Sequence, residues 1–115
     1  MAYDFAGRTP IFCDVDGTLL LWPCEDSGRI PREGEPGYGQ PPTVNVELVA
    51  ALRRAVADGA ALVIWSHNGA EHARSAAQRC GIDHLADAIL AKPRVMIDDE
   101  FRWIENQKKT LRVQA

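Results

Sequence analysis

Short apolar runs alternate with segments of helical periodicity, and this alternation constrains the fold of the chain more than any other feature. Each run ends at a polar or turn-forming residue, so we expect each to be a buried strand. Between the first two runs, apolar residues recur every three or four positions over 45–58, which predicts a helix with Asn45 as its N-cap. Alternating strands and helices predict an α/β fold with a parallel sheet. The predicted strands are 10–14 (PIFCD), 60–65 (AALVIW), 88–91 (AILA) and 94–97 (RVMI).

A second helix is expected between the second and third runs. Asn68-Gly-Ala-Glu71 resembles a capping box that would start it, and Gly81 is placed to end it. Its apolar face would consist of Ala70, Ala73, Ala77 and Cys80. Near the end of the chain, we expect a short helix at 101–108 and an edge strand at 110–114.

The segment from Leu20 to Thr43 has a different composition, with five prolines and four glycines in 24 positions. Such a segment cannot form a regular helix or a central strand. A loop of this length in a small domain is usually functional or mobile, so we expect a flap or loop at about 20–43. Trp22 and Tyr38 in or near it would either stack on a substrate or pin the loop to the domain.

Length and composition favour one globular domain spanning residues 1–115, because 46% of the residues are apolar and 25% are charged. The net charge of −3 provides no basic surface for nucleic acid or membranes, and no apolar stretch approaches the ~20 residues of a membrane span. The first ten residues do not follow the pattern of a signal peptide. The three cysteines are not closely spaced, which favours a reducing compartment, so we expect a cytoplasmic domain.

Polar side chains follow the predicted strands, at the point where each strand ends. Because the carboxyl ends of parallel strands share one edge of a sheet, these side chains are expected to lie close together. Carboxylates crowded at one edge would repel each other unless a cation joined them, and Mg²⁺ prefers oxygen ligands and tolerates phosphate. A nearby ammonium, a hydroxyl and the start of a helix would complete a phosphate pocket. The residues concerned are Asp14, Asp16, Ser66, Lys92, Asp98 and Asp99.

The same residues resemble the motifs of the haloacid dehalogenase (HAD) superfamily of phosphotransferases. Asp14-Val15-Asp16-Gly17-Thr18 after an apolar strand is similar to the first motif, and Ser66 and Lys92 are similar to the second and third. Asp98-Asp99 is similar to the fourth motif, and the four matches occur in the family's order between residues 10 and 100. The resemblance implies a three-layer, Rossmann-like open parallel sheet of minimal size, without a large cap.

The resemblance also implies a role for each matching residue. Asp14 would attack phosphorus to form an aspartyl-phosphate, and Asp16 would act as general acid and then general base. Mg²⁺ would be held by the Asp14 carboxylate, the Asp16 carbonyl and Asp99, with Asp98 beside them. The residues expected to contact the phosphate are Val15, Gly17, Thr18, Ser66, His67 and Lys92.

The function predicted in this way is Mg²⁺-dependent hydrolysis of a phosphomonoester, and several alternatives stay open. The phosphoryl acceptor could be a group other than water, or the domain could bind a phosphorylated partner without turnover. A receiver-like regulatory domain is also α/β, but it carries its phosphorylated Asp after the middle strand, where this chain has Ser66.

The partner expected from the sequence is a phosphorylated substrate whose class is not defined. Without a cap, the site could also be covered by a second subunit of a homo-oligomer. His67 would be either structural or a substrate contact, whereas His72 and His84 are expected at the surface. The sequence contains neither HExxH nor CxxC spacing, which argues against a zinc site.

Overall fold

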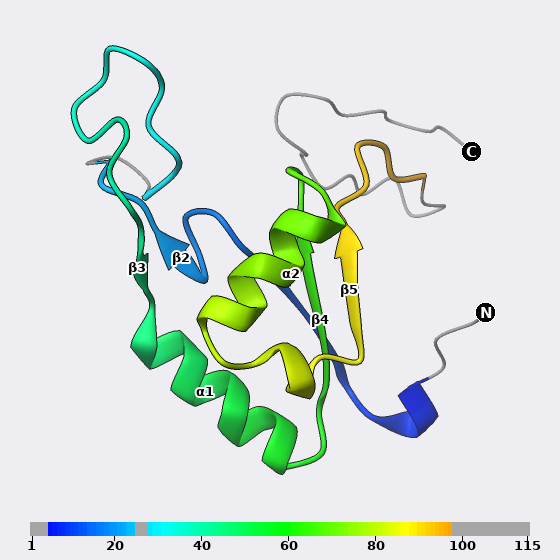
Figure 1. Ribbon diagram of the computed structural model, residues 1–115. Helices are drawn as coiled ribbons and strands as arrows, with labels where there is room; N and C mark the ends of the chain where they lie inside the picture. Colours follow the sequence, from blue (N-terminus) through cyan, green and yellow to red (C-terminus); the bar gives the residue numbers. More distant parts are fainter. Residues whose placement is uncertain (1–4, 25–27, 98–115) are drawn as a thin grey trace.

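The centre of the fold is a sheet of three parallel strands, shown in Figure 1. The computed structural model describes residues 5–24 and 28–97. In the sheet, β4 (Ala61–Ser66) lies between β1 (Pro10–Asp14) and β5 (Ala88–Ala91). The side chains of Leu62, Val63 and Ile64 are at most 1% exposed, as expected for a central strand of a parallel sheet. The α/β class and the first three predicted strands are thus confirmed.

Two helices pack into one apolar core with the sheet. Helix α1 (Val46–Ala57) joins β1 to β4 after the Gly/Pro-rich segment, and α2 (Ala70–Arg79) joins β4 to β5. Short 3₁₀ turns lie at η1 (Phe5–Gly7) and η2 (Asp83–Leu85). The buried core combines residues of both helices, of the sheet and of the turn after β1: Cys13, Val15, Leu19, Leu20, Val49, Leu52, Leu62, Ile64, Ala73, Ala76, Ala77, Cys80 and Ile82.

The two helix starts differ in how far the sequence predicted them. Asn45 caps α1 as expected, since its side chain accepts a hydrogen bond from the Leu48 amide at 3.2 Å. The predicted capping box of α2 is wrong. The N-cap is Gly69, at φ 103°, and it makes no side-chain cap. The Asn68 side chain points instead to Asp16, which accepts a hydrogen bond from its amide group.

A two-stranded antiparallel ribbon closes the base of the Gly/Pro-rich segment. It pairs β2 (Leu20–Leu21) with β3 (Thr43–Val44). Between these strands, residues 22–24 and 28–42 contain no helix or strand, in agreement with the expected loop. In Figure 1 this loop lies at the end of the molecule toward which β4 and β5 point.

The predicted fourth strand at 94–97 is wrong, because this segment has no strand conformation. Pro93 lacks an amide donor, and the side chains of Val95 and Ile97 are 50% and 72% exposed, so they gain little from packing. The face of the sheet away from the core carries Phe12 and Trp65, whose ring centroids are 4.7 Å apart.

The rest of the predicted architecture falls beyond the structure described. The helix at 101–108 and the strand at 110–114 lie outside the described residues, as do Asp98 and Asp99. Within residues 5–24 and 28–97, no helix combines the length and the apolar character needed to cross a bilayer.

Candidate functional site

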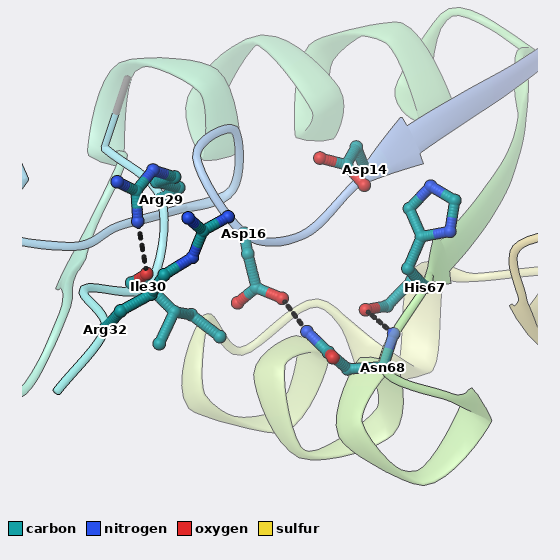
Figure 2. A pocket seen from close by; sticks show the side chains of 8 residues that line it. Asp14, Asp16, Arg29, Ile30, Arg32, His67 and Asn68 are labelled. Carbon is teal, nitrogen blue, oxygen red and sulfur yellow. Dashed lines mark hydrogen bonds between the residues drawn. The ribbon is translucent and has the colours of Figure 1, made fainter. Parts of the chain in front are cut away.

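The carboxyl ends of β1 and β4 border a cleft of about 320 Å³, and the residue that follows β5 contacts Asp14. Asp14 is the last residue of β1, Ser66 is the last residue of β4, and Lys92 directly follows β5. The Lys92 amide donates to the Ser66 carbonyl at 2.8 Å, which fixes the two strand ends to each other. The structure thus brings together polar residues that are far apart in the sequence. The cleft is lined by Asp14, Asp16, Arg29, Ile30, Arg32, Ser66, His67 and Asn68 (Figure 2).

Asp14 has one partner on each carboxylate oxygen. Thr18 Oγ1 donates to Oδ2 at 3.3 Å, and Lys92 Nζ lies 3.4 Å from Oδ1. The ammonium also lies 5.8 Å from the ring centroid of Trp65, within the range of a cation–π contact. The Asp14 side chain remains 32% exposed. It is therefore oriented by its neighbours and still accessible from the cleft.

Asp16 is held by three donors from two other parts of the chain. Trp22 Nε1 donates to Oδ1 at 2.9 Å, and Asn68 Nδ2 donates to Oδ2 at 2.9 Å. His72 Nε2 lies 3.0 Å from Oδ1 and 2.9 Å from Oδ2. Only 14% of the Asp16 side chain is exposed. Through these contacts Asp16, in the turn after β1, is joined to the loop and to the start of α2.

Two of these three donors were missed by the sequence analysis. His72 was expected at the surface, but its side chain is 30% exposed and lies against Asp16, so that expectation is wrong. Asn68 was expected to cap α2. The two residues are four positions apart, which places side chains on one side of a helix and its N-terminal extension. That spacing was the feature of the sequence that could have indicated the shared contact with Asp16.

The two aromatic residues of the loop differ in their role. Trp22 attaches the loop to Asp16 through its indole N–H, whereas Tyr38 is 57% exposed and does not line the cleft.

The turn after β1 is a compact backbone structure. The Val15 carbonyl accepts hydrogen bonds from three successive amides, those of Thr18, Leu19 and Leu20. Gly17 has φ 84°, which favours glycine, and its amide donates to the Leu20 carbonyl at 2.8 Å. The Val15 side chain is fully buried. Gly17 and Thr18 therefore use their amides within the turn, and Thr18 directs its hydroxyl at Asp14.

Ser66 and His67 form the wall of the cleft next to α2. Ser66 is 1% exposed, and its hydroxyl accepts a hydrogen bond from the main-chain amide of Asn68 at 3.0 Å. The His67 Nε2 atom is buried and has no hydrogen-bond partner among the described residues. Burial, followed by the nearby Lys92 ammonium, lowers the pKa of His67 against the opposing effect of Asp14. An unpaired buried polar atom costs ~1–3 kcal/mol, so any hydrogen bond that this nitrogen gained would stabilise the site.

The loop contributes Arg29, Ile30 and Arg32 to the cleft. The sequence predicted a flap in this region but did not identify the residues that reach the site. The path of a Gly/Pro-rich loop is not set by hydrophobic periodicity, and no motif marked these two arginines.

Part of the predicted metal site lies within the described residues. No group of three His, Cys, Asp or Glu side chains there is placed to hold a metal ion. The oxygen donors of Asp14 and Asp16 nevertheless suit Mg²⁺, which is often bound by one or two carboxylates together with waters and substrate phosphate. The chemistry of these donors fits the ion, and the other two predicted ligands, Asp98 and Asp99, follow the last described residue.

No protein-family model, curated protein or solved structure matches this chain.

Proposed function

We propose that the chain is a Mg²⁺-dependent phosphomonoester hydrolase of the HAD type, with Asp14 as the nucleophile. The observation that carries this proposal is the position of Asp14, at the end of β1 and 3.4 Å from the Lys92 ammonium, in a cleft that Ser66 also lines. An accessible carboxylate beside a fixed cation and a hydroxyl suits attack on a phosphoryl group. The finer fold proposed with this function is a HAD-like, three-layer open parallel sheet of minimal size without a large cap.

The reaction consists of two displacements at phosphorus. In the first, an Asp14 oxygen attacks the phosphorus, the bond to the substrate oxygen breaks, and Asp16 in its acid form gives that oxygen a proton. In the second, Asp16 takes a proton from water, the water oxygen attacks the aspartyl-phosphate, and the bond to Asp14 breaks. The products are the alcohol and inorganic phosphate, and both aspartates return to their starting forms.

Residues around Asp14 would bind the transferring group. The Lys92 ammonium, the Ser66 hydroxyl and the His67 ring would contact phosphoryl oxygens, and Lys92, which lies 3.4 Å from Asp14 Oδ1, would also orient Asp14. The Asp14 carboxylate, the Asp16 carbonyl and Asp99 would hold Mg²⁺, with Asp98 beside them. When bound, the ion supplies positive charge that offsets the charges of the carboxylates and the phosphate.

One observation favours a second candidate function, phosphoryl binding without turnover. Both carboxylate oxygens of Asp16 accept hydrogen bonds from Trp22, Asn68 and His72, which leaves them less available to a leaving group. Catalysis requires Asp16 to exchange at least one of these partners for the substrate or water.

The test is phosphate release from p-nitrophenyl phosphate, with and without Mg²⁺, by the wild type and by Asp14→Asn. A matched control is Asp58→Asn, which removes an exposed carboxylate at the far end of α1. We expect turnover that requires Mg²⁺, falls to background in Asp14→Asn and is unchanged in the control. Binding of Mg²⁺ and inorganic phosphate without turnover, measured by calorimetry, would support the second candidate. Absence of both turnover and binding would refute the proposed site.

A further inference from the structure

Two arginines of the loop enter the same cleft as the aspartates. Arg29 and Arg32 line it together with Ile30, although the loop is far from Ser66 and His67 in the sequence. In Figure 2 the arginines lie on the side of Asp16 opposite to His67. The cleft therefore has two ends of different chemistry, one with Asp14 and Ser66, and one with two guanidinium groups.

Glu35 organises the arginine end. It forms a bidentate ion pair with Arg29, with N–O distances of 3.0 and 2.9 Å, and its Oε1 accepts the Arg32 amide at 2.6 Å. These hydrogen bonds, those of Arg29 first, lower the pKa of Glu35 to about 2. Glu35 is therefore ionised at any physiological pH and offsets the charge of Arg29. Pro31, between the two arginines of the cleft, is buried.

Arg32 differs from Arg29 in how its guanidinium is paired. Arg29 bonds to Glu35 and to the Ile30 carbonyl, whereas the Arg32 guanidinium forms no hydrogen bond or ion pair with the described residues. Two hydrogen bonds join Arg32 to Glu35, and both use the main chain of Arg32: its amide donates to the Glu35 carboxylate, and its carbonyl accepts from the Glu35 amide at 2.9 Å. They fix the main chain and leave the side chain for a ligand. A guanidinium presents paired N–H groups that match the oxygens of a phosphate or a carboxylate.

We infer that Arg32 binds a second anionic group of the substrate, while the phosphoryl group to be removed lies at Asp14. This inference rests on the proposed hydrolase function and narrows it to one substrate class. The substrate is a small phosphomonoester that carries a further phosphate or carboxylate. The cleft volume of about 320 Å³ lies at the lower end of the range for small-molecule sites, which fits a compact doubly anionic molecule.

The experiment compares substrates that differ only in the second group. The first set consists of alkanediol bisphosphates with chains of about three to six carbons, and the second has a carboxylate at the far end. The reference set has a hydroxyl at the far end of the same chains. We expect kcat/KM of the wild type to be on the order of 10- to 100-fold higher with a second anion than with the hydroxyl, mainly through KM. The phosphate and carboxylate sets then show which anion Arg32 prefers.

The variant Arg32→Gln tests the assignment to one side chain. It is expected to lower the ratio of kcat/KM between anionic and hydroxyl substrates by on the order of tenfold or more. The matched control is Arg54→Gln, which removes an exposed arginine from the last turn of α1, and it should leave the ratio unchanged. A wild type without a preference, or an Arg32→Gln enzyme that keeps it, would overturn the inference.

Failure of this inference can be told apart from failure of the proposed function. If p-nitrophenyl phosphate is hydrolysed in an Asp14-dependent manner but no set is preferred, the hydrolase stands and the Arg32 subsite does not exist. If nothing is hydrolysed, binding of the same bisphosphates is measured by calorimetry on the wild type and Arg32→Gln. Binding that depends on Arg32 supports the subsite in a non-catalytic domain, and equal or absent binding overturns it.

Discussion

The contact between His72 and Asp16 can be tested without assuming any activity. The perturbation is a double-mutant cycle of Asp16→Asn, His72→Ala and the combined variant, because a cycle isolates the pair from the other partners of Asp16. The Nε2 atom lies 2.9 and 3.0 Å from the two carboxylate oxygens, and the side chains are 30% and 14% exposed. The pair is therefore better shielded from water than a typical surface ion pair.

The expected coupling free energy follows from this partial burial. Exposed ion pairs contribute about 0.2–1 kcal/mol, and hydrogen bonds to charged groups contribute about 1.5–3 kcal/mol. Because Asp16 is nearly buried and His72 is partly exposed, we expect a coupling of ~1–2 kcal/mol in the free energy of unfolding. The measurement is urea denaturation of the wild type, the two single variants and the double variant at one pH. Unfolding is monitored by tryptophan emission and by far-UV circular dichroism.

The control is a second double-mutant cycle, in which Glu71, the exposed residue next to His72 on the same helix, is substituted and His72 is kept. Glu71→Ala combined with Asp16→Asn should be additive within about 0.5 kcal/mol, because Glu71 is exposed and is not among the hydrogen-bond partners of Asp16 in the described residues. If the coupling of Asp16 with His72 is as small as in this control, the contact does not hold Asp16. The assignment of His72 to the site would then be refuted.

Two further predictions concern groups away from the cleft. The Arg8 guanidinium and then the Leu62 amide lower the pKa of Asp87 below 3.8, so its carboxylate stabilises the fold above that pH and loses this effect as the pH falls through the folded-state value. Asp87→Asn should thus lower the free energy of unfolding by ~1 kcal/mol near neutral pH, and by less below pH 3.8, as measured by urea denaturation of the wild type and the variant. An equal loss of stability at the two pH values would contradict this prediction. Burial raises the pKa of Cys13 to about 11 and also raises that of Cys80, so a disulfide reagent at mildly alkaline pH should modify only half-buried Cys24. Fast modification of more than one thiol without denaturant would contradict the described core.

Hydrophobic patterning was sufficient to predict the elements that carry the site. The apolar run at 60–65 predicted β4, and the spacing of apolar residues over 45–58 predicted α1 with Asn45 as its N-cap. Once these strands are parallel, their carboxyl ends share an edge, so the proximity of Asp14 to Ser66 follows from topology. Local patterns reach this far because burial on a strand or a helix is periodic.

Patterning failed where neither burial nor helical period determines the structure. The run at 94–97 is apolar, yet Val95 and Ile97 are exposed and no strand forms, because an apolar run becomes a strand only where a neighbouring strand and a core accept it. The loop arginines were missed for a related reason. The main chain at Arg32 is held by Glu35, which also pairs with Arg29 six positions before it, and these contacts lie in a segment without periodicity.

Asp16 connects the two ends of the cleft. Through Trp22 it fixes the beginning of the loop, which carries Arg29 and Arg32, and through Asn68 and His72 it fixes the start of α2 beside Ser66 and His67. Substituting Asp16 would therefore disturb the position of the loop and of α2 as well as remove a proton-transfer group. Loss of activity in Asp16→Asn alone could not assign acid–base catalysis to this residue. A change in the leaving-group dependence of kcat, with folding and phosphate binding retained, is the result that would separate chemistry from architecture.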